Sequence, residues 1–193
     1  LHMSTIDAKT MRTDGQLLLT SAIWGFAFAA QRAGMDFVGP FTYNGVRFLL
    51  GTLSLLPLLL LRREGRTPKG LYLHGAVVGV LLFAGSSLQQ VALQYTTAGK
   101  AGFITGLYVV LVPIIGHLLG MRSDSGRWVG ALLALIGLYF LSVTDAFTLA
   151  PGDGMVMLCA LFFAAHVLYL SYVSPRLPTV KLSLVQYAVC AVA

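Results

Sequence analysis

Arg47 is a charged residue inside a long apolar segment, about six residues and so about 9 Å from the segment's start at ~1.5 Å per helical residue. A charge at the centre of a membrane-spanning helix costs on the order of 3 kcal/mol, so its presence suggests a function. A guanidinium binds a carboxylate or phosphate through two parallel hydrogen bonds. With Asn44 one turn before it, Arg47 is therefore a candidate ligand for an anionic group. The alternative is a structural arginine that extends to the lipid headgroups or binds the carbonyls of a helix end.

Polar and aromatic residues recur at helical spacing in three other apolar segments. They are Ser21, Trp24, Phe28 and Gln31 in one segment, Ser86, Gln89 and Gln90 in another, and Thr105 and Tyr108 in a third. Residues three or four apart lie on one face of a helix. An aromatic wall that ends in an amide suits an amphipathic small molecule, so these residues are candidate ligands of such a molecule. The alternative is helix packing without contact to any ligand.

Gln89 and Gln90 are adjacent, so on a helix their side chains point about 100° apart. We expect one of them to face a cavity and the other to hydrogen-bond a neighbouring helix. Further along, Pro113 follows Thr105 and Tyr108. A proline inside a helix removes a backbone hydrogen bond, which predicts a kink and makes Pro113 a candidate hinge. A static kink is the alternative.

His166 lies near the middle of an apolar segment, and Tyr169 follows it by one turn. An imidazole, which titrates near about pH 6.5, would suit proton coupling. The alternative is a neutral histidine that hydrogen-bonds a neighbouring residue. We expect no Asp or Glu inside the apolar segments, and therefore no carboxylate proton relay in them. The two cysteines, Cys159 and Cys190, lack the spacing of a disulfide framework or metal site, and we predict neither a metal nor a cofactor.

The segments that carry these residues have the composition of a membrane protein. The chain is 57% hydrophobic and 10% charged with a mean hydropathy of +0.81, whereas soluble domains are about one-quarter charged. Lipid permits only helices or closed barrels, and a helix needs about 20 apolar residues to cross it. Without period-two alternation we predict helices at residues 15–34, 41–61, 71–95, 101–121, 127–145, 153–173 and from 182 onward. The predicted fold is all-α and integral to the membrane, with about six complete spans and part of a seventh.

Basic residues concentrate in alternate loops between these segments. Ten of the 13 Lys and Arg residues fall on one side, namely Lys9, Arg12, Arg62, Arg63, Arg66, Lys69, Arg122, Arg127, Arg176 and Lys181. Lys and Arg mark the cytoplasmic side of a membrane, so we predict a multi-pass protein of the inner (plasma) membrane with a cytoplasmic N-terminus. The net charge of +6 resides mainly in these loop clusters, and we expect no nucleic-acid partner. A cleavable signal peptide is the alternative for the first segment.

Two segments begin alike, at Asp14-Gly15 and at Asp153-Gly154. Because an odd number of spans separates them, the second copy would be inverted in the membrane, as in many transporters. We predict a cytoplasmic tail over 1–14, a first five-helix repeat over 15–145 and the start of a second, inverted repeat over 146–193. The complete pattern would be five plus five helices, with this sequence truncated inside its seventh span. The alternative is two unrelated helices that share an Asp-Gly start.

Three stretches resemble the EamA-type members of the drug/metabolite transporter superfamily. They are Ala22-Ile23-Trp24-Gly25, Pro40 with Arg47, and the join from Gln89 to Ile104 followed by Leu111-Val112-Pro113. The resemblance implies ten helices, with spans one to four and six to nine around a central cavity. It also implies transport of amino acids, metabolites or drugs, mostly outward, by alternating access.

The sequence therefore predicts a secondary transporter for small metabolites such as amino acids, organic acids or drugs, working in efflux. Basic residues at one end of the segments, Arg32, Arg47 and Lys100, favour an anionic or zwitterionic solute. A phosphate loop, an HExxH motif and a cysteine cluster are all missing from the sequence, so we do not predict an enzyme. Alternatives are a membrane fragment that transports nothing and a seven-helix sensor or receptor. The expected partners are the solute and the lipid bilayer, with a homodimer as an open alternative.

Overall fold

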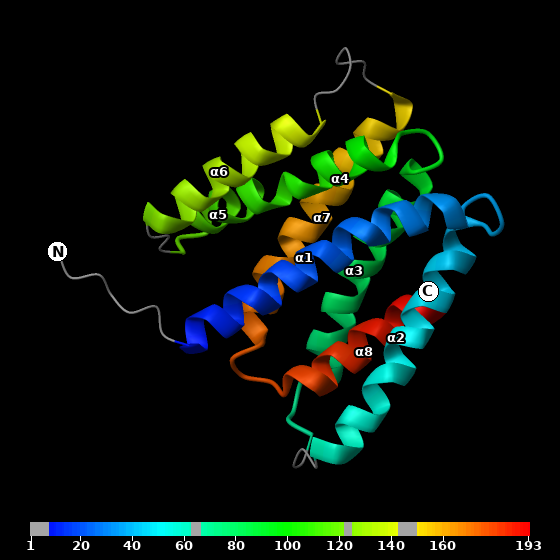
Figure 1. Cartoon of the computed structure of the whole chain (residues 1–193). Helices are drawn as coiled ribbons and strands as arrows, with labels where there is room; N and C mark the ends of the chain where they lie inside the picture. The colour runs from blue at the N-terminus through cyan, green and yellow to red at the C-terminus, as the bar shows by residue number, and fades with distance from the viewer. Residues whose placement is uncertain (1–7, 63–66, 122–124, 143–149) are drawn as a thin grey trace.

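The computed structural model describes residues 8–62, 67–121, 125–142 and 150–193 of the 193-residue chain, and the regular structure of this part is helical (Figure 1). The helices are α1 (Ala8–Gly34), α2 (Pro40–Arg62), α3 (Leu71–Ala92), α4 (Ala98–Gly106), α5 (Tyr108–Leu118), α6 (Ser125–Ser142), α7 (Pro151–Val173) and α8 (Thr179–Val192). Every predicted apolar segment overlaps a helix or, for 101–121, two helices. α1 begins at Ala8, inside the predicted tail over 1–14, and the last residues of the predicted segment 127–145 lie outside the described residues. The prediction of an all-α membrane helix bundle is confirmed.

Four helical stretches of the described residues are long and apolar enough to cross a membrane. They are Pro40–Leu61, Leu71–Ala92, Ala98–Leu118 and Pro151–Val173, while Trp128–Gly137 and Thr179–Val192 are shorter apolar helices. The complete spans predicted over 15–34 and 127–145 correspond to α1 and α6, which do not reach this measure of length and hydropathy. Large apolar side chains on α1, α2 and α6 are exposed, as expected for surfaces that meet lipid or further helices.

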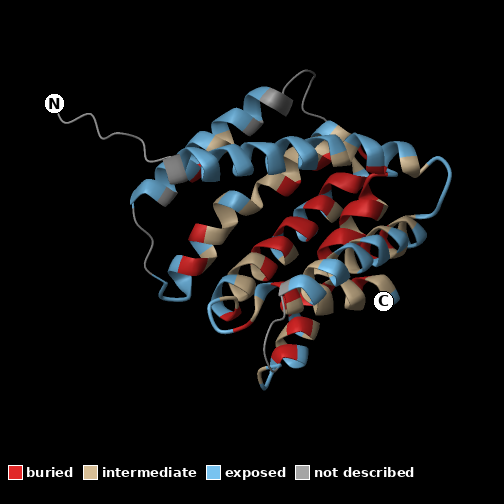
Figure 2. Cartoon of the chain, turned by 60° about the horizontal axis from the view of Figure 1, so that its bottom comes forward, coloured by how far each residue is buried: buried red, intermediate tan, exposed pale blue. Residues whose placement is uncertain are grey.

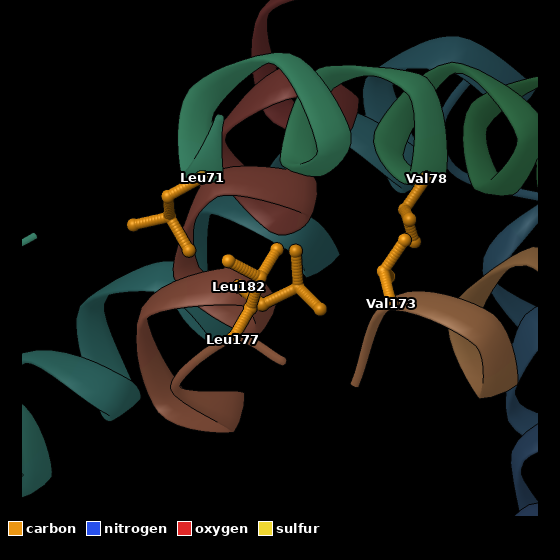
Figure 3. Close-up of a cluster of buried hydrophobic side chains, with 5 residues drawn as sticks. All are labelled: Leu71, Val78, Val173, Leu177 and Leu182. Carbon is orange, nitrogen blue, oxygen red and sulfur yellow. The ribbon is translucent and has the colours of Figure 1, made fainter. Parts of the chain in front are cut away.

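The buried core of the described residues runs along α3, α7 and α8. α3 packs along both α7 and α8, and α2 packs along α8. Figure 2 shows the buried residues concentrated on these central helices, whereas α1 and α6 are largely exposed. At one end of this core Leu71, Leu177 and Leu182 pack together, and Val78 and Val173 point toward one another (Figure 3). Helices from both predicted repeats thus share one core.

Glycines allow α8 to approach α2 and α3 closely. A Cβ on Gly75 would lie 2.6 Å from Val185 Cγ1, and one on Gly79 would lie 2.8 Å from Val189 Cβ. On α2, a Cβ on Gly51 would lie 3.3 Å from the ring of Tyr187. Small residues at such spacing let helices associate in a membrane, where hydrophobicity supplies little attraction between them. The Gly75–Gly79 pair therefore allows α3 and α8 to pack closely.

The predicted span over 101–121 is divided at Leu107, between α4 and α5. Leu107 N donates to the Ile104 carbonyl at 3.2 Å, a spacing of three residues in place of four. α5 continues through Pro113, so the interruption lies six residues before the predicted hinge. Pro113 gives no hydrogen bond to the preceding turn, and Gly106 is a weak helix former, which together weaken the helix on this side of the proline.

The predicted domain boundary at 145/146 lies outside the described residues, as do Arg63, Arg66 and Arg122 among the loop bases. The division into two repeats and the sidedness of the loops therefore stay predictions.

Substituting Gly79 with alanine should destabilise the bundle. The added Cβ would meet Val189 Cβ at 2.8 Å and Gln186 Cα at 3.1 Å, so α8 must shift, at an expected cost of about 1–3 kcal/mol. The measurement is the temperature at which detergent-solubilised protein loses its monodisperse elution peak. Gly130→Ala is the matched control, because nothing lies within 4 Å of its added Cβ. Equal losses for the two variants would contradict the close packing of α8.

Candidate functional site

Several predicted site residues lie at one end of the bundle, where α1 and α3 end and α2, α4 and α7 begin (Figure 1). We call this the upper end, after its place in Figure 1. The end of α1 abuts the start of α2 here, since a Cβ on Gly34 would collide with the ring of Tyr43. Phe28 of α1 packs against an apolar cluster of Ala92, Leu93, Ala101 and Val156, which lies where α3 ends and α4 and α7 begin. These contacts bring Gln31, Asn44 and Gln90, which lie within about one turn of them, to the same end.

The Ser86 carbonyl of α3 accepts from the side chain of Asn44 and, as in a regular helix, from the backbone of Gln90. Asn44 Nδ2 donates to the Ser86 carbonyl oxygen at 3.1 Å. In a regular α-helix the N–H of Gln90 donates to this same carbonyl, four residues earlier. Both side chains are almost completely buried, yet Asn44 Oδ1 and both amide atoms of Gln90 have no hydrogen-bond partner among the described residues. The two amides therefore form a buried polar group with unused hydrogen-bonding capacity.

Gln89 points to a different set of helices. Its Nε2 donates to Thr105 Oγ1 at 3.0 Å and lies 3.9 Å from the Cys159 sulfur, so it joins α3 to α4 and α7. Thr105 is itself buried. Gln89 is thus the glutamine that bonds neighbouring helices, and Gln90 is the one without a described partner.

An aromatic row crosses the bundle beside these polar residues. The ring of Tyr108 lies 6.1 Å from that of Trp24, edge to face, and 6.2 Å from that of Phe163. Such distances are within the favourable range for aromatic pairs. The candidate faces of α1 and of the α4–α5 segment therefore meet, and α7 extends the row.

Arg47 is half-buried and contacts an aromatic ring. Its guanidinium carbon lies 4.8 Å from the centre of the Phe48 ring, and that ring lies 5.8 Å from the ring of Tyr187 on α8. No carboxylate of the described residues forms an ion pair with Arg47, whereas Arg32 pairs with Asp36 at 3.5 Å on the surface. The cation–π contact with Phe48 is weak and does not neutralise the Arg47 charge.

His166 and Tyr169 have separate partners on other helices. His166 Nε2 lies 3.0 Å from Gln186 Oε1 of α8, and Tyr169 Oη lies 2.8 Å from His74 Nδ1 of α3. Each pair joins α7 to a neighbouring helix, and neither pair includes Gln31, Asn44 or Gln90 at the upper end. The contact of His166 is the one expected for a histidine that bonds a neighbour.

Asp153 corrects the expectation that the apolar segments hold no carboxylate. It lies in the first turn of α7 with only 3% of its surface exposed. Asp153 Oδ1 accepts from Thr96 Oγ1 at 2.6 Å, and Oδ2 accepts from Ala150 N at 2.8 Å. A helix often begins with proline at its first position and an acidic residue in its first turn. Pro151 followed by Asp153 has this pattern, which could have identified Asp153 as part of the helix start.

Two apolar cavities lie away from the polar residues. One, of about 330 Å³, is lined by α5, α6 and α7 and includes Pro113. The other, of about 310 Å³, lies beside the α4–α5 interruption and includes Leu107. Among the residues that the structure describes, no group of three or more His, Cys, Asp or Glu could hold a metal ion.

Comparison with known proteins places this arrangement among transporters. Residues 12–143 match the EamA-like transporter family. An uncharacterized transporter of Archaeoglobus fulgidus is 40% identical over 168 residues, which are 86% of this chain and 51% of the relative. The uncharacterized inner membrane transporter YedA of Escherichia coli is 31% identical over 130 residues, 66% of this chain and 42% of the relative. The chain spans about half the length of these relatives. No solved structure matches.

Replacing Thr96 with valine should loosen the start of α7. The change removes the hydroxyl that donates to the buried Asp153 carboxylate, at an expected cost of about 1–3 kcal/mol. Thermal unfolding in detergent measures this loss, and Thr42→Val, at an exposed position of α2, is the control. In a double-mutant cycle, Thr96→Val should reduce the stability much less in the Asp153→Ala background than in the unaltered protein. Additive losses would mean that the two residues do not interact.

Proposed function

Because the chain belongs to the EamA-like transporter family, we propose that the protein is a secondary transporter that moves a small metabolite outward across the membrane by alternating access. The relatives that it matches are named as transporters, which favours transport over catalysis. The classes of solute proposed from the sequence, amino acids, organic acids and drugs, all fit this activity.

The observation that carries the proposal further is the position of Arg47. Its charge is half-buried in a span of the bundle, and no described carboxylate neutralises it. A cation in this setting binds an anionic group more strongly than it would in water, because lipid and protein screen charge poorly. We therefore propose that the solute carries a carboxylate or a similar anion that pairs with Arg47.

The aromatic row suits the apolar part of the solute. Trp24 is about half exposed and Tyr108 is half-buried between it and Phe163. Such rings give a large contact area with little conformational entropy to lose. We propose that Trp24 and Tyr108 bind the solute, with Gln31, Asn44 and Gln90 at the upper end. Gln89, Thr105, His166 and Tyr169 would instead hold the helices that form the site.

Alternating access requires an element that bends. The α4–α5 segment is interrupted at Leu107 and carries Pro113 six residues later. A small cavity lies beside Leu107, so its side chain has space to move. We propose that bending occurs between Leu107 and Pro113, in a helix that carries both Thr105 and Tyr108.

An inner (plasma) membrane location with the N-terminus in the cytoplasm belongs to the same proposal. Its support is the distribution of Lys and Arg in the sequence and the name of the YedA relative, which is an inner membrane transporter.

Arg47→Ala should reduce the flux of anionic and zwitterionic solutes by about tenfold or more, the loss expected for one charge-assisted contact. The measurement is radiolabelled amino-acid and organic-acid flux by the complete gene product in proteoliposomes, with and without a proton gradient. Arg12→Ala, at an exposed position in α1 outside the candidate site, is the control and should leave the flux unchanged. Unchanged flux in Arg47→Ala would refute the anion site.

A further inference from the structure

We propose that the upper end of the bundle holds a binding site for a small monovalent cation, formed by Gln31, Asn44, Ser87 and Gln90. The cation is either a free alkali ion such as Na⁺ or the ammonium group of the solute. These share one chemistry, a compact positive charge held by neutral oxygen atoms. The second source rests on the proposed transport function, whereas the first does not.

The observation behind the site is a group of buried polar atoms without partners. Gln31 is 2% exposed, Asn44 1%, Ser87 8% and Gln90 0%. Gln31 Oε1, Asn44 Oδ1, Ser87 Oγ and both amide atoms of Gln90 have no hydrogen-bond partner in the part of the chain that the structure describes. Native proteins rarely leave buried polar atoms unpaired, because each one loses its hydration without compensation. Four such side chains together indicate that another group completes them.

The four side chains come from adjoining parts of α1, α2 and α3. Ser87 and Gln90 are one turn apart on the same face of α3. Asn44 binds the Ser86 carbonyl, to which the backbone of Gln90 also donates in a regular helix. Gln31 lies one turn before Gly34, which abuts the ring of Tyr43, the residue that precedes Asn44.

The unpaired atoms are mostly hydrogen-bond acceptors. Gln31 Nε2 donates to the Ala27 carbonyl at 3.1 Å and Asn44 Nδ2 to the Ser86 carbonyl at 3.1 Å. A carbonyl accepts only from the nitrogen end of an amide, so these two bonds fix which end of each side chain is left unpaired. The amide oxygens of Gln31, Asn44 and Gln90 and the Ser87 hydroxyl are therefore the acceptors available to a bound guest.

Acceptor oxygens require a guest that is positive or rich in donors. In membrane proteins, carbonyl-type oxygens replace the hydration shell of alkali ions. Divalent ions are usually held by carboxylates, and no carboxylate is among these four residues. A set of neutral oxygens therefore suits a single positive charge.

Two arginines lie close to this site in the sequence. Arg32 follows Gln31 and pairs with Asp36 on the surface, whereas Arg47, one turn after Asn44, has its guanidinium over the Phe48 ring and no ion pair with a described carboxylate. Its positive charge weakens the binding of a cation as long as no anion neutralises it. An anionic group bound at Arg47 removes this repulsion, so cation and anion should each raise the affinity for the other. Such mutual effects are equal by thermodynamic linkage.

The test is equilibrium cation binding by the complete gene product in lipid nanodiscs. Radioactive Na⁺ binding and thermal unfolding are measured in NaCl, KCl or methylammonium chloride, against N-methylglucamine chloride at the same ionic strength. We expect saturable binding and a raised unfolding temperature with Na⁺, methylammonium or both. Stabilisation by Na⁺ assigns the site to a free ion, and stabilisation by methylammonium alone assigns it to the ammonium group of the solute.

Gln90→Met should weaken the binding about tenfold or more, because it removes one ligand of the charged guest while keeping the side-chain length. Gln94→Met, at an exposed position after α3, is the matched control and should bind like the unaltered protein. If Gln90→Met disturbs folding, Ser87→Ala, which removes a single hydroxyl, replaces it. Stabilisation by none of the cations, or equal affinity in Gln90→Met and Gln94→Met, would overturn the site and leave only buried water at these atoms.

Arg47→Ala separates this inference from the proposed function. The variant should lose solute flux yet keep cation binding at equal or higher affinity, since a repelling charge is gone. Cation binding by a protein that moves no solute would refute the transport proposal alone. Solute flux by a protein without cation binding would refute the cation site alone.

Discussion

Lipid offers no hydrogen bonds, so the polar side chains that this bundle buries depend on partners within the protein. α3 supplies most of them in the described structure. Its Ser86 carbonyl binds Asn44 of α2, its Gln89 binds Thr105 of α4, and its Gly79 carbonyl accepts from Cys190 of α8 at 3.3 Å. α2, α4 and α8 are therefore each held against α3 by a different polar group.

Composition was sufficient to predict the helices, because an apolar run long enough to cross a bilayer has few other ways to satisfy its backbone. The segments predicted at 41–61 and 153–173 appear as Pro40–Arg62 and Pro151–Val173. The interruption at Leu107 was not predicted, since hydropathy stays high through it. It depends on backbone bonds, for which Gly106 and Pro113 give only an indirect signal.

The candidate site was predictable only in part. Spacing along a helix identified which residues share a face, and the structure brings Trp24 to Tyr108 across two such faces. Which helix supplies a partner is a tertiary question. The partners of His166 and Tyr169 come from α8 and α3, 20 and 95 residues away in the sequence. Asp153 was missed because we read its position as the edge of a segment, whereas the packing of α7 against the α3–α4 connection buries it.

The surface of α2 and α3 on which α8 packs has a consequence for the order of folding. Gly51 of α2 and Gly75 and Gly79 of α3 line the surface that α8 covers. The Cys190 side chain and the Gly79 carbonyl that it contacts are 111 residues apart. During synthesis α2 and α3 are inserted into the membrane before α8 has been made. Their glycine-lined faces therefore contact lipid until α8 is inserted. Contacts of such long range form slowly. The interval between the insertion of α3 and that of α8 is therefore the period in which this chain is most open to mispairing with other membrane helices.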